Sequence, residues 1–409
     1  MGLDRSLKSP LGTGFGWARG LLVGAGTLAG VAGCATPLPR TPVPEALTER
    51  AKPLDLDGIR TFGDAPADSH TRGINATAPL IRARLLASNA RGQVPVERYL
   101  AISGGADNGA FGAGLLVGWG ATGRRPEFTV VTGISAGALI APFVFLGPGY
   151  DKQMAEMFTA YDSEDIYRSD VLAGLFGGSA LADTTPLANL IEKYTDERMF
   201  AAIARERAKG RLLLIGTTNL DAERPVYWDV GRLAQSRHPE AIATFRKVLL
   251  ASAAVPGLFP PVRFHVTANG KSYEELHVDG GVTKEVILAP AHFDFKALDA
   301  MVGIKPRREL FIIRNGKANP EWNPVKESAA QIAARSLETL IKYQGVGDLQ
   351  RIYTIAQAEG IEYNLMSIPS TFDQKYPGPF NRVYMSALFK LGYKTGRGTI
   401  PWQKQPPPL

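Results

Sequence analysis

"TVVTGISAGALIAPFVFLG", residues 129–147, places a serine between two glycines, after an apolar strand-like run and before an apolar helix-like run. A nucleophile on a sharp strand-to-helix turn needs this pattern, because its backbone is strained and a side chain at either glycine would clash with neighbouring elements. We therefore interpret Ser135 as a nucleophile and Gly133 and Gly137 as the glycines of its turn. The helix that follows would point its N-terminus at the site, which favours developing negative charge.

Strand-like and helix-like runs alternate on both sides of this turn. Residues 97–105 read as a buried strand running into glycines, residues 110–123 as a helix of small residues, and residues 127–133 as the next strand. Apolar strands alternating with helices predict a mostly parallel sheet with both faces covered. Further strands are expected within 211–231, 275–281, 309–316 and 361–369, and helices at 78–90, 151–161, 186–194, 239–254 and 325–344.

A glycine-rich loop, "SGGADNGAFGAG" at residues 103–114, follows the first of these strands. Acyl transfer needs backbone N–H donors aimed at the negative charge that develops on the carbonyl oxygen, and such a loop can supply them. The alternative is a phosphate-binding turn of a dinucleotide fold. The loop lacks the G-x-G-x-x-G order of that turn, which favours the first interpretation.

A nucleophilic serine also needs a base, and histidine is the usual one. None of the five histidines lies in a loop that resembles the setting of a triad histidine. Asp279 instead ends a strand-like run and is followed by Gly280 and Gly281, which would place its carboxylate at the carboxyl end of the sheet, where it could accept the serine proton directly. Two alternatives stay open: "DGG" is only a turn, or His277 or His292 is the base. The five histidines are His70, His238, His265, His277 and His292.

The segments "SGGADNGAFGAG", "GISAG", "ASAAVPGLFPPV" and "VDGG", in this order, resemble the patatin-like phospholipases over residues 97–316. The resemblance implies a three-layer αβα hydrolase with a mostly parallel central sheet and a serine nucleophile elbow. It also implies a Ser-Asp dyad in which Ser135 is the nucleophile and Asp279 the general base. The implied substrates are acyl lipids, with no metal or organic cofactor. The family's oxyanion loop corresponds to Gly104, Gly105 and Ala106 and closes at Gly109.

The chain departs from the family pattern at two positions of this loop. Ala106 stands where the family usually has a third glycine, and Asn108 where it usually has a basic residue. Ala106 can still donate its N–H, provided its φ is negative. The loss of the basic residue weakens the expectation of a phospholipid preference more than that of ester hydrolysis. These departures also leave room for a catalytically inactive, membrane-tethered scaffold as a rival to the enzyme.

The N-terminal residues read as a lipoprotein signal peptide, residues 1–33. Basic residues precede an apolar run at 20–31 that is too short to cross a bilayer comfortably, and "VAGC" resembles a bacterial lipobox ending in Cys34, the only cysteine of the chain. We expect Cys34 to be acylated, with palmitate among its chains. Because Ala35 follows it, we expect anchoring in the outer membrane, facing the periplasm. A single cysteine also excludes an intrachain disulfide.

Composition divides the rest of the chain. Residues 34–53 are proline-rich and predict an extended tether, 54–96 a lead-in segment, and 97–400 the patatin-like domain, with C-terminal helices over 317–400. The net charge of +7 is dispersed, with no Lys/Arg-rich run. This pattern predicts no nucleic-acid partner. The expected partners are an acyl lipid and a membrane surface, and the sequence points to no protein partner.

Overall fold

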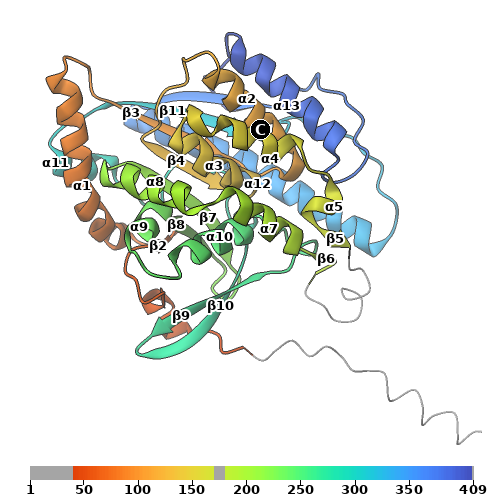
Figure 1. Cartoon of the computed structure of the whole chain (residues 1–409), viewed down its shortest axis with the longest axis horizontal. Helices are drawn as coiled ribbons and strands as arrows, with labels where there is room; N and C mark the ends of the chain where they lie inside the picture. Colours follow the sequence, from red (N-terminus) through yellow and green to blue (C-terminus); the bar gives the residue numbers. More distant parts are fainter. Residues whose placement is uncertain (1–39, 170–179, 408–409) are drawn as a thin grey trace, which may run out of the picture.

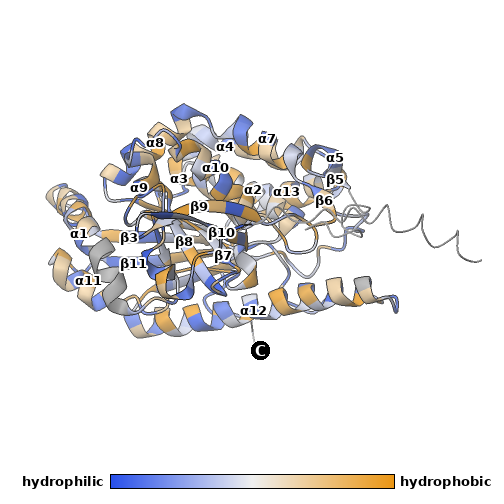
Figure 2. Cartoon of the chain, turned by 90° about the horizontal axis from the view of Figure 1, so that it is seen from below, coloured by the Kyte–Doolittle hydropathy of each residue, from blue (hydrophilic) through white to orange (hydrophobic). Residues whose placement is uncertain are grey.

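Five parallel strands form one half of a ten-stranded sheet in the computed structural model, which describes residues 40–169 and 180–407 (Figures 1 and 2). The serine elbow follows one of the middle strands. In spatial order the five are β12 (Glu362–Ser367), β11 (Arg307–Arg314), β3 (Val96–Ile102), β4 (Val130–Ile134) and β7 (Leu212–Asn219). The strands expected from the sequence at these places are confirmed.

Helices cover both faces of the sheet, as Figure 2 shows. Alternate residues of β3 separate the two layers: Leu100 and Ile102 belong to one hydrophobic cluster, and Tyr99 and Ala101 to another. The larger layer contains α2 (Gly109–Gly120), α3 (Ala136–Leu146), α4 (Asp151–Thr159), α7 (Thr185–Tyr194), α8 (Glu197–Ala208), α10 (Ala241–Ser252) and α13 (Arg382–Arg397). On the opposite face lie α1 (Ala67–Ala90), α11 (Phe295–Val302) and α12 (Ala329–Glu359). The predicted three-layer fold with a mostly parallel sheet is thereby confirmed.

Antiparallel strands extend the sheet beyond β7. On one edge, β8 (Arg224–Asp229) pairs with β7 and with β2 (Arg60–Phe62), while β10 (Lys271–Asp279) pairs with both β7 and β9 (Val262–Ala268). The short helix α9 (Val230–Gln235) follows β8 and packs against α8. Since β2 comes from the segment predicted as a lead-in, that segment supplies part of the sheet.

The second part of the predicted tether, residues 40–53, is not an extended spacer in the structure. Residues 52–53 form β1 (Lys52–Pro53), which pairs with β9, and the carbonyl of Thr41 accepts a hydrogen bond of 2.8 Å from the amide of Glu274. Arg40 also forms an ion pair with Asp221. Strand pairing and this ion pair hold residues 40–53 against the domain, so they do not form an extended spacer.

Helices α2 and α13 pack with their backbones in contact, and glycine makes this possible. A Cβ on Gly114 would lie 2.1 Å from the carbonyl oxygen of Phe389, and a Cβ on Gly392 would lie 2.2 Å from that of Phe111. Real Cβ atoms do not approach backbone oxygens so closely, so any side chain would force the helices apart. The C-terminal helix is therefore fixed to the helix that follows the glycine-rich loop.

Among the described residues, none of the helices combines the length and the apolar character that crossing a membrane requires. The predicted signal peptide and Cys34 lie outside the described residues.

Candidate active site

Ser135 lies on the sharp turn between β4 and α3, with φ of 53° and ψ of −123°. Non-glycine residues rarely adopt such angles, and they persist where the surroundings enforce them, commonly at active sites. Both flanking glycines are required by close approach. A Cβ on Gly133 would lie 2.4 Å from the carbonyl oxygen of Gly137, and a Cβ on Gly137 would lie 2.3 Å from that of Ile102.

Two strand ends meet beside this turn along one edge of β7. Because β8 occupies the other edge of β7, strands β4 and β10 must share this one. The last residue of β4, Ile134, is opposite Gly216, and the last residue of β10, Asp279, is opposite Thr217. Since β4 is parallel and β10 antiparallel to β7, their carboxyl ends face each other at adjacent positions. Asp279 thus reaches the elbow from an antiparallel strand, which differs from its expected place at the carboxyl end of a parallel one.

The Ser135 side chain lies next to the carboxylate of Asp279. The amide of Gly281 donates a hydrogen bond of 2.8 Å to the same carboxylate. Both side chains are buried, with 5% exposure each. Burial raises the pKa of Asp279 to about 7, although the Ser135 hydroxyl and the Gly281 amide both favour its ionised form. A carboxyl with this pKa can take up and release a proton near neutral pH.

The backbone of the elbow is fixed by Ser252 on α10. The Ser252 hydroxyl accepts a hydrogen bond of 3.0 Å from the amide of Ser135 and donates one of 2.7 Å to the carbonyl of Gly216. Ser252 is completely buried. It therefore links the elbow to the position on β7 where the two strand ends meet.

The glycine-rich loop lies directly against Ser135. A Cβ built on Gly104 would be 3.0 Å from the Cβ of Ser135, and Gly105 has a φ of 143°, which only glycine adopts without strain. Within residues 40–169 and 180–407, no acceptor is bonded to the amides of Gly104, Gly105 or Ala106. These amides are available to an oxyanion formed on a substrate bound at Ser135.

Asn315 holds the loop in place, a role that the sequence did not reveal. Its side-chain amide donates to the carbonyl of Ser103 at 2.9 Å, and its side-chain oxygen accepts from the amide of Gly112 at 3.1 Å. Its own backbone amide donates to the Ser103 hydroxyl at 2.8 Å. The only signal in the sequence is a polar residue between a predicted strand and Gly316.

The φ of Ala106 is +49°, not the negative value that we expected its role as a donor to require, but its amide has no acceptor among the described residues and stays available. The Cβ crowds the neighbouring backbone in this left-handed conformation, where the family's usual glycine is unstrained. We expect Ala106→Gly to raise the free energy of unfolding by up to about 1 kcal/mol, measured by urea denaturation. Ala121, which is exposed and has a φ of −61°, provides the control: Ala121→Gly should lower the free energy of unfolding. A lower stability in both variants would contradict strain at Ala106.

The histidines proposed as alternative bases have other surroundings. His277 is completely buried, with Nδ1 2.9 Å from the Thr217 hydroxyl and Nε2 3.2 Å from the carboxylate of Glu275. Burial lowers the pKa of His277, so the ring is neutral, and the ionised Glu275 accepts a hydrogen bond from the N–H of Nε2. Both ring nitrogens are thus occupied by partners other than Ser135. His292 is exposed. His238 is half-buried and His265 exposed, while the side chain of His70 lies outside the described residues.

A second buried carboxyl, Glu285, lies beside Asp279 and was missed in the sequence. Its oxygens would be 3.0 and 3.1 Å from a Cβ on Gly104, and 2.9 Å from a Cβ on Gly281. Burial, and then the negative charge of Asp279, raise the pKa of Glu285 to about 8, against the opposing effect of Arg314. Glu285 is therefore protonated at neutral pH while Asp279 is partly ionised.

A raised pKa in the folded state destabilises the protein as pH increases, because the unfolded chain releases the proton first. We expect Glu285→Gln to raise the free energy of unfolding by on the order of 2 kcal/mol at pH 8. This gain should fade as the pH falls towards 4.5 and vanish below it, where the glutamate is protonated in both states. Urea denaturation at several pH values measures it, with the exposed Glu164→Gln as control. A gain independent of pH would contradict the assignment.

An apolar cavity of about 50 Å³ opens beside Ser135. Leu139 and Met157 line it from the helical layer, and Phe380 lines it from the segment before α13. Asn108, at the position where the family has a basic residue, accepts a hydrogen bond of 3.0 Å from the hydroxyl of Tyr384. The surroundings of the dyad thus offer apolar contacts on one side and backbone donors on the other. Among the described residues, no group of histidine, cysteine and acidic side chains could hold a metal ion.

Together these features define a three-layer α/β hydrolase fold with an elbow serine beside a buried carboxyl. Residues 100–292 match the family model described as patatin-like phospholipase, so this segment is a patatin-like phospholipase domain. The resemblance identified in the sequence is thereby confirmed.

Several solved structures are distantly similar to the chain. VipD from Legionella pneumophila is 14% identical over 73% of this chain and 66% of its own length, with a TM-score of 0.36. Human GIVD cytosolic phospholipase A2 is 12% identical over 78% of this chain and 53% of its own, with a TM-score of 0.34. The chain thus spans less than two thirds of the length of either protein. A comparison with curated proteins found no significant match.

Proposed function

We propose that the protein is a lipid acyl hydrolase that cleaves carboxylic esters of acyl lipids with a Ser-Asp dyad. The observation that carries this proposal is the meeting of the elbow serine Ser135 with the buried carboxylate of Asp279, at the adjacent ends of β4 and β10. Its position within a patatin-like phospholipase domain supports acyl lipids as the substrate class. The apolar side chains beside the serine suit an acyl chain.

In the first half of the reaction, the Ser135 oxygen attacks the ester carbonyl and its proton passes to Asp279. The amides of Gly104, Gly105 and Ala106 donate to the oxyanion of the tetrahedral intermediate. When the intermediate collapses, Asp279 returns the proton to the departing alcohol. An acyl ester on Ser135 remains.

In the second half, water enters where the alcohol was. Asp279 takes a proton from the water as its oxygen bonds to the acyl carbon, and the same amides bind the second oxyanion. The bond to Ser135 then breaks, and the serine oxygen recovers the proton from Asp279. The products are the free acid and the unmodified enzyme.

Two measurements on the purified protein test this proposal. A long-chain fluorophosphonate should label Ser135 covalently, as mass spectrometry of the labelled peptide would reveal. A panel of phospholipids, monoacylglycerols and nitrophenyl esters should then identify the substrates that are hydrolysed. A protein that is neither labelled nor active on any ester would favour the scaffold alternative. The engaged side chain of Asn108 gives no support for binding a phosphate there.

We also propose that the enzyme is anchored by acylated Cys34 in the outer membrane, facing the periplasm and next to its substrate. We expect Cys34→Ser to abolish palmitate labelling and release the protein from the membrane fraction. Stable anchoring needs more than one acyl chain, and the substitution removes the residue that would carry them. Metabolic labelling and cell fractionation measure both effects, with Thr36→Ala as the matched control. Palmitate incorporation into Cys34→Ser would contradict the assignment.

A further inference from the structure

A cavity of about 950 Å³ lies on the face of the sheet covered by α1 and α11. Its floor includes Val130, the first residue of β4, and Leu214 of β7. Ser135 follows the last residue of β4, roughly 16 Å further along the strand at 3.3 Å per residue. No lining residue is common to this cavity and the one beside Ser135. Its volume is within the range of small-molecule sites.

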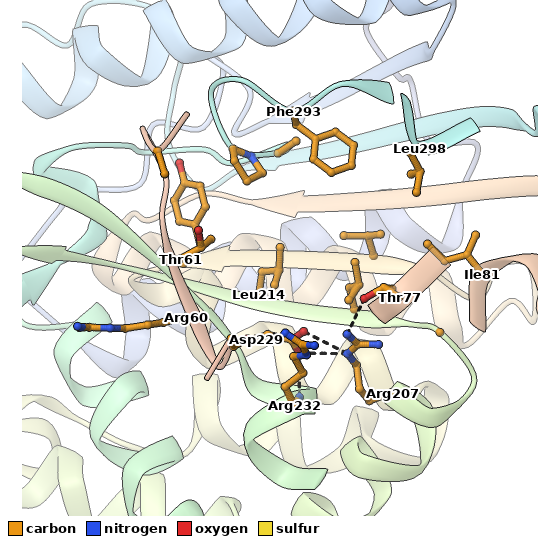
Figure 3. A pocket seen from close by; sticks show the side chains of 18 of the residues that line it. Arg60, Thr61, Thr77, Ile81, Arg207, Leu214, Asp229, Arg232, Phe293 and Leu298 are labelled. Carbon is orange, nitrogen blue, oxygen red and sulfur yellow. Dashed lines mark hydrogen bonds and ion pairs between the residues drawn. The ribbon is translucent and has the colours of Figure 1, made fainter. Parts of the chain in front are cut away.

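The cavity is divided into an apolar side and a charged side (Figure 3). Phe293 and Leu298 lie on one wall, while Arg207, Asp229 and Arg232 gather on the wall opposite. Leu214 lies between the two walls. Aliphatic side chains from α1, α11 and the residues before α11 continue the apolar surface: Ile81, Leu85, Leu288, Leu298 and Val302.

Most of the lining charges are neutralised within the protein. Four lining arginines each pair with a carboxylate: Arg60 with Glu275, Arg84 with Glu97, Arg207 with Asp229, and Arg308 with Asp299. The lining carboxylates Glu49 and Asp57 are likewise paired, with Arg224 and Lys52.

Arg232 is the exception among the arginines of the cavity. Its guanidinium donates one hydrogen bond, of 3.1 Å, to the carbonyl of Gly58, and no carboxylate in the described part of the chain pairs with it. A Cβ on Gly58 would lie 2.2 Å from Nη1 of Arg232, and Gly58 has a φ of 70°. The glycine therefore lets the backbone wrap the guanidinium, which leaves one oriented positive charge beside an apolar cavity.

We propose that this cavity binds one long acyl chain with an anionic head group, as a lipid site separate from Ser135. The head group accepts hydrogen bonds from Arg232, and the chain lies along Leu214, Phe293 and Leu298. A single unneutralised charge on the charged side, facing an apolar side, matches a ligand with one charge at one end of an apolar chain. A fatty acid and a lysophosphatidic acid share this chemistry.

The test is a fluorescence titration of the full chain carrying Ser135→Ala with cis-parinaric acid, a fluorescent fatty acid. We expect one saturable site, from which oleate and oleoyl-lysophosphatidic acid displace the probe. Oleyl alcohol, with the same chain but no charge, should compete about tenfold less well, because it lacks a charge-assisted hydrogen bond. The stronger of the two anionic competitors identifies the head group.

Substitutions locate the site. Arg232→Gln should make oleate and oleyl alcohol displace the probe equally well. Arg232→Lys, which keeps the positive charge, should retain part of the preference for oleate. Leu214→Trp, which fills the cavity from a half-buried position, should lower the affinity for the probe at least about tenfold. Arg205→Gln and Leu220→Trp, at exposed positions outside the cavity, are the matched controls and should bind like the parent. Circular dichroism checks that each variant is folded.

Leu139→Trp in the cavity beside Ser135 separates the two sites. Probe binding should survive it. Absence of saturable binding in the Ser135→Ala protein, or binding lost in Leu139→Trp but kept in Leu214→Trp, would overturn the proposal. Equal competition by oleate and oleyl alcohol would overturn the role of Arg232. Because the titration needs no hydrolysis, its outcome is independent of whether Ser135 is a nucleophile.

Discussion

Ester hydrolysis is expected to fall by about 10⁴-fold or more when Ser135 is replaced by alanine. The hydroxyl is the proposed nucleophile, and without it no acyl-enzyme can form. The substitution removes one atom and leaves the amides of the loop in place, so the fold should be unchanged. Steady-state hydrolysis of a short-chain nitrophenyl ester measures the loss.

Ser252→Ala is the useful comparison for this experiment. Ser252 contacts the backbone of Ser135 and has no part in the proposed proton transfer, so its loss should lower stability far more than it lowers labelling of folded protein. In contrast, Ser135→Ala should lose both hydrolysis and fluorophosphonate labelling. If Ser135→Ala keeps more than a few per cent of the activity with an unchanged circular dichroism spectrum, Ser135 is not the nucleophile.

Asp279→Asn should be as damaging as Ser135→Ala, while His277→Gln and His292→Gln should keep most of the activity. An asparagine has the shape of aspartate but cannot accept the serine proton, and loss of a catalytic base commonly costs about 10⁴-fold. His277 uses both ring nitrogens on Thr217 and Glu275, so a several-fold loss through weaker packing is the most we expect there.

All four variants should be compared at matched folding, because His277 is buried and its replacement disturbs its neighbours. Because His292 is exposed, His292→Gln shows the effect of removing a histidine without disturbing buried neighbours. If a histidine variant falls to the level of Ser135→Ala while Asp279→Asn stays active, a histidine-dependent esterase replaces the dyad.

The elbow and the "DGG" turn could be predicted because their sequence patterns are local. The two glycines flank Ser135 within five residues, and the runs of apolar residues on either side identify the strand and the helix. Gly133 is needed by the turn itself, whereas Gly137 is needed by the carbonyl of Ile102 on β3, which the sequence alone does not show. The direction of β10 was not predictable, since a strand that ends in glycines has the same pattern whether it is parallel or antiparallel. Its pairing with β7 depends on a hairpin with β9.

The supporting residues were missed because their contacts span long distances in the sequence. Asn315 holds a loop more than 200 positions earlier, and Glu285 meets Gly104 across a similar separation. Neither residue is unusual for its neighbourhood in the sequence. Strands β1 and β2, of two and three residues, are also too short to show alternation. Such features become visible only once the tertiary pairing is known.

The close packing of α2 against α13 has a consequence for how the protein is made. The two helices are separated by about 260 residues, so at usual elongation rates the ribosome finishes α13 on the order of tens of seconds after α2. Until then, the backbone surface of α2 that faces Phe389 and Gly392 has no cover, and Asp107 and Asn108 lack their partners near Phe380 and Tyr384. The nascent chain therefore carries Ser135 long before α13 supports the loop beside it, so the proposed active site is complete only after α13 has been synthesised.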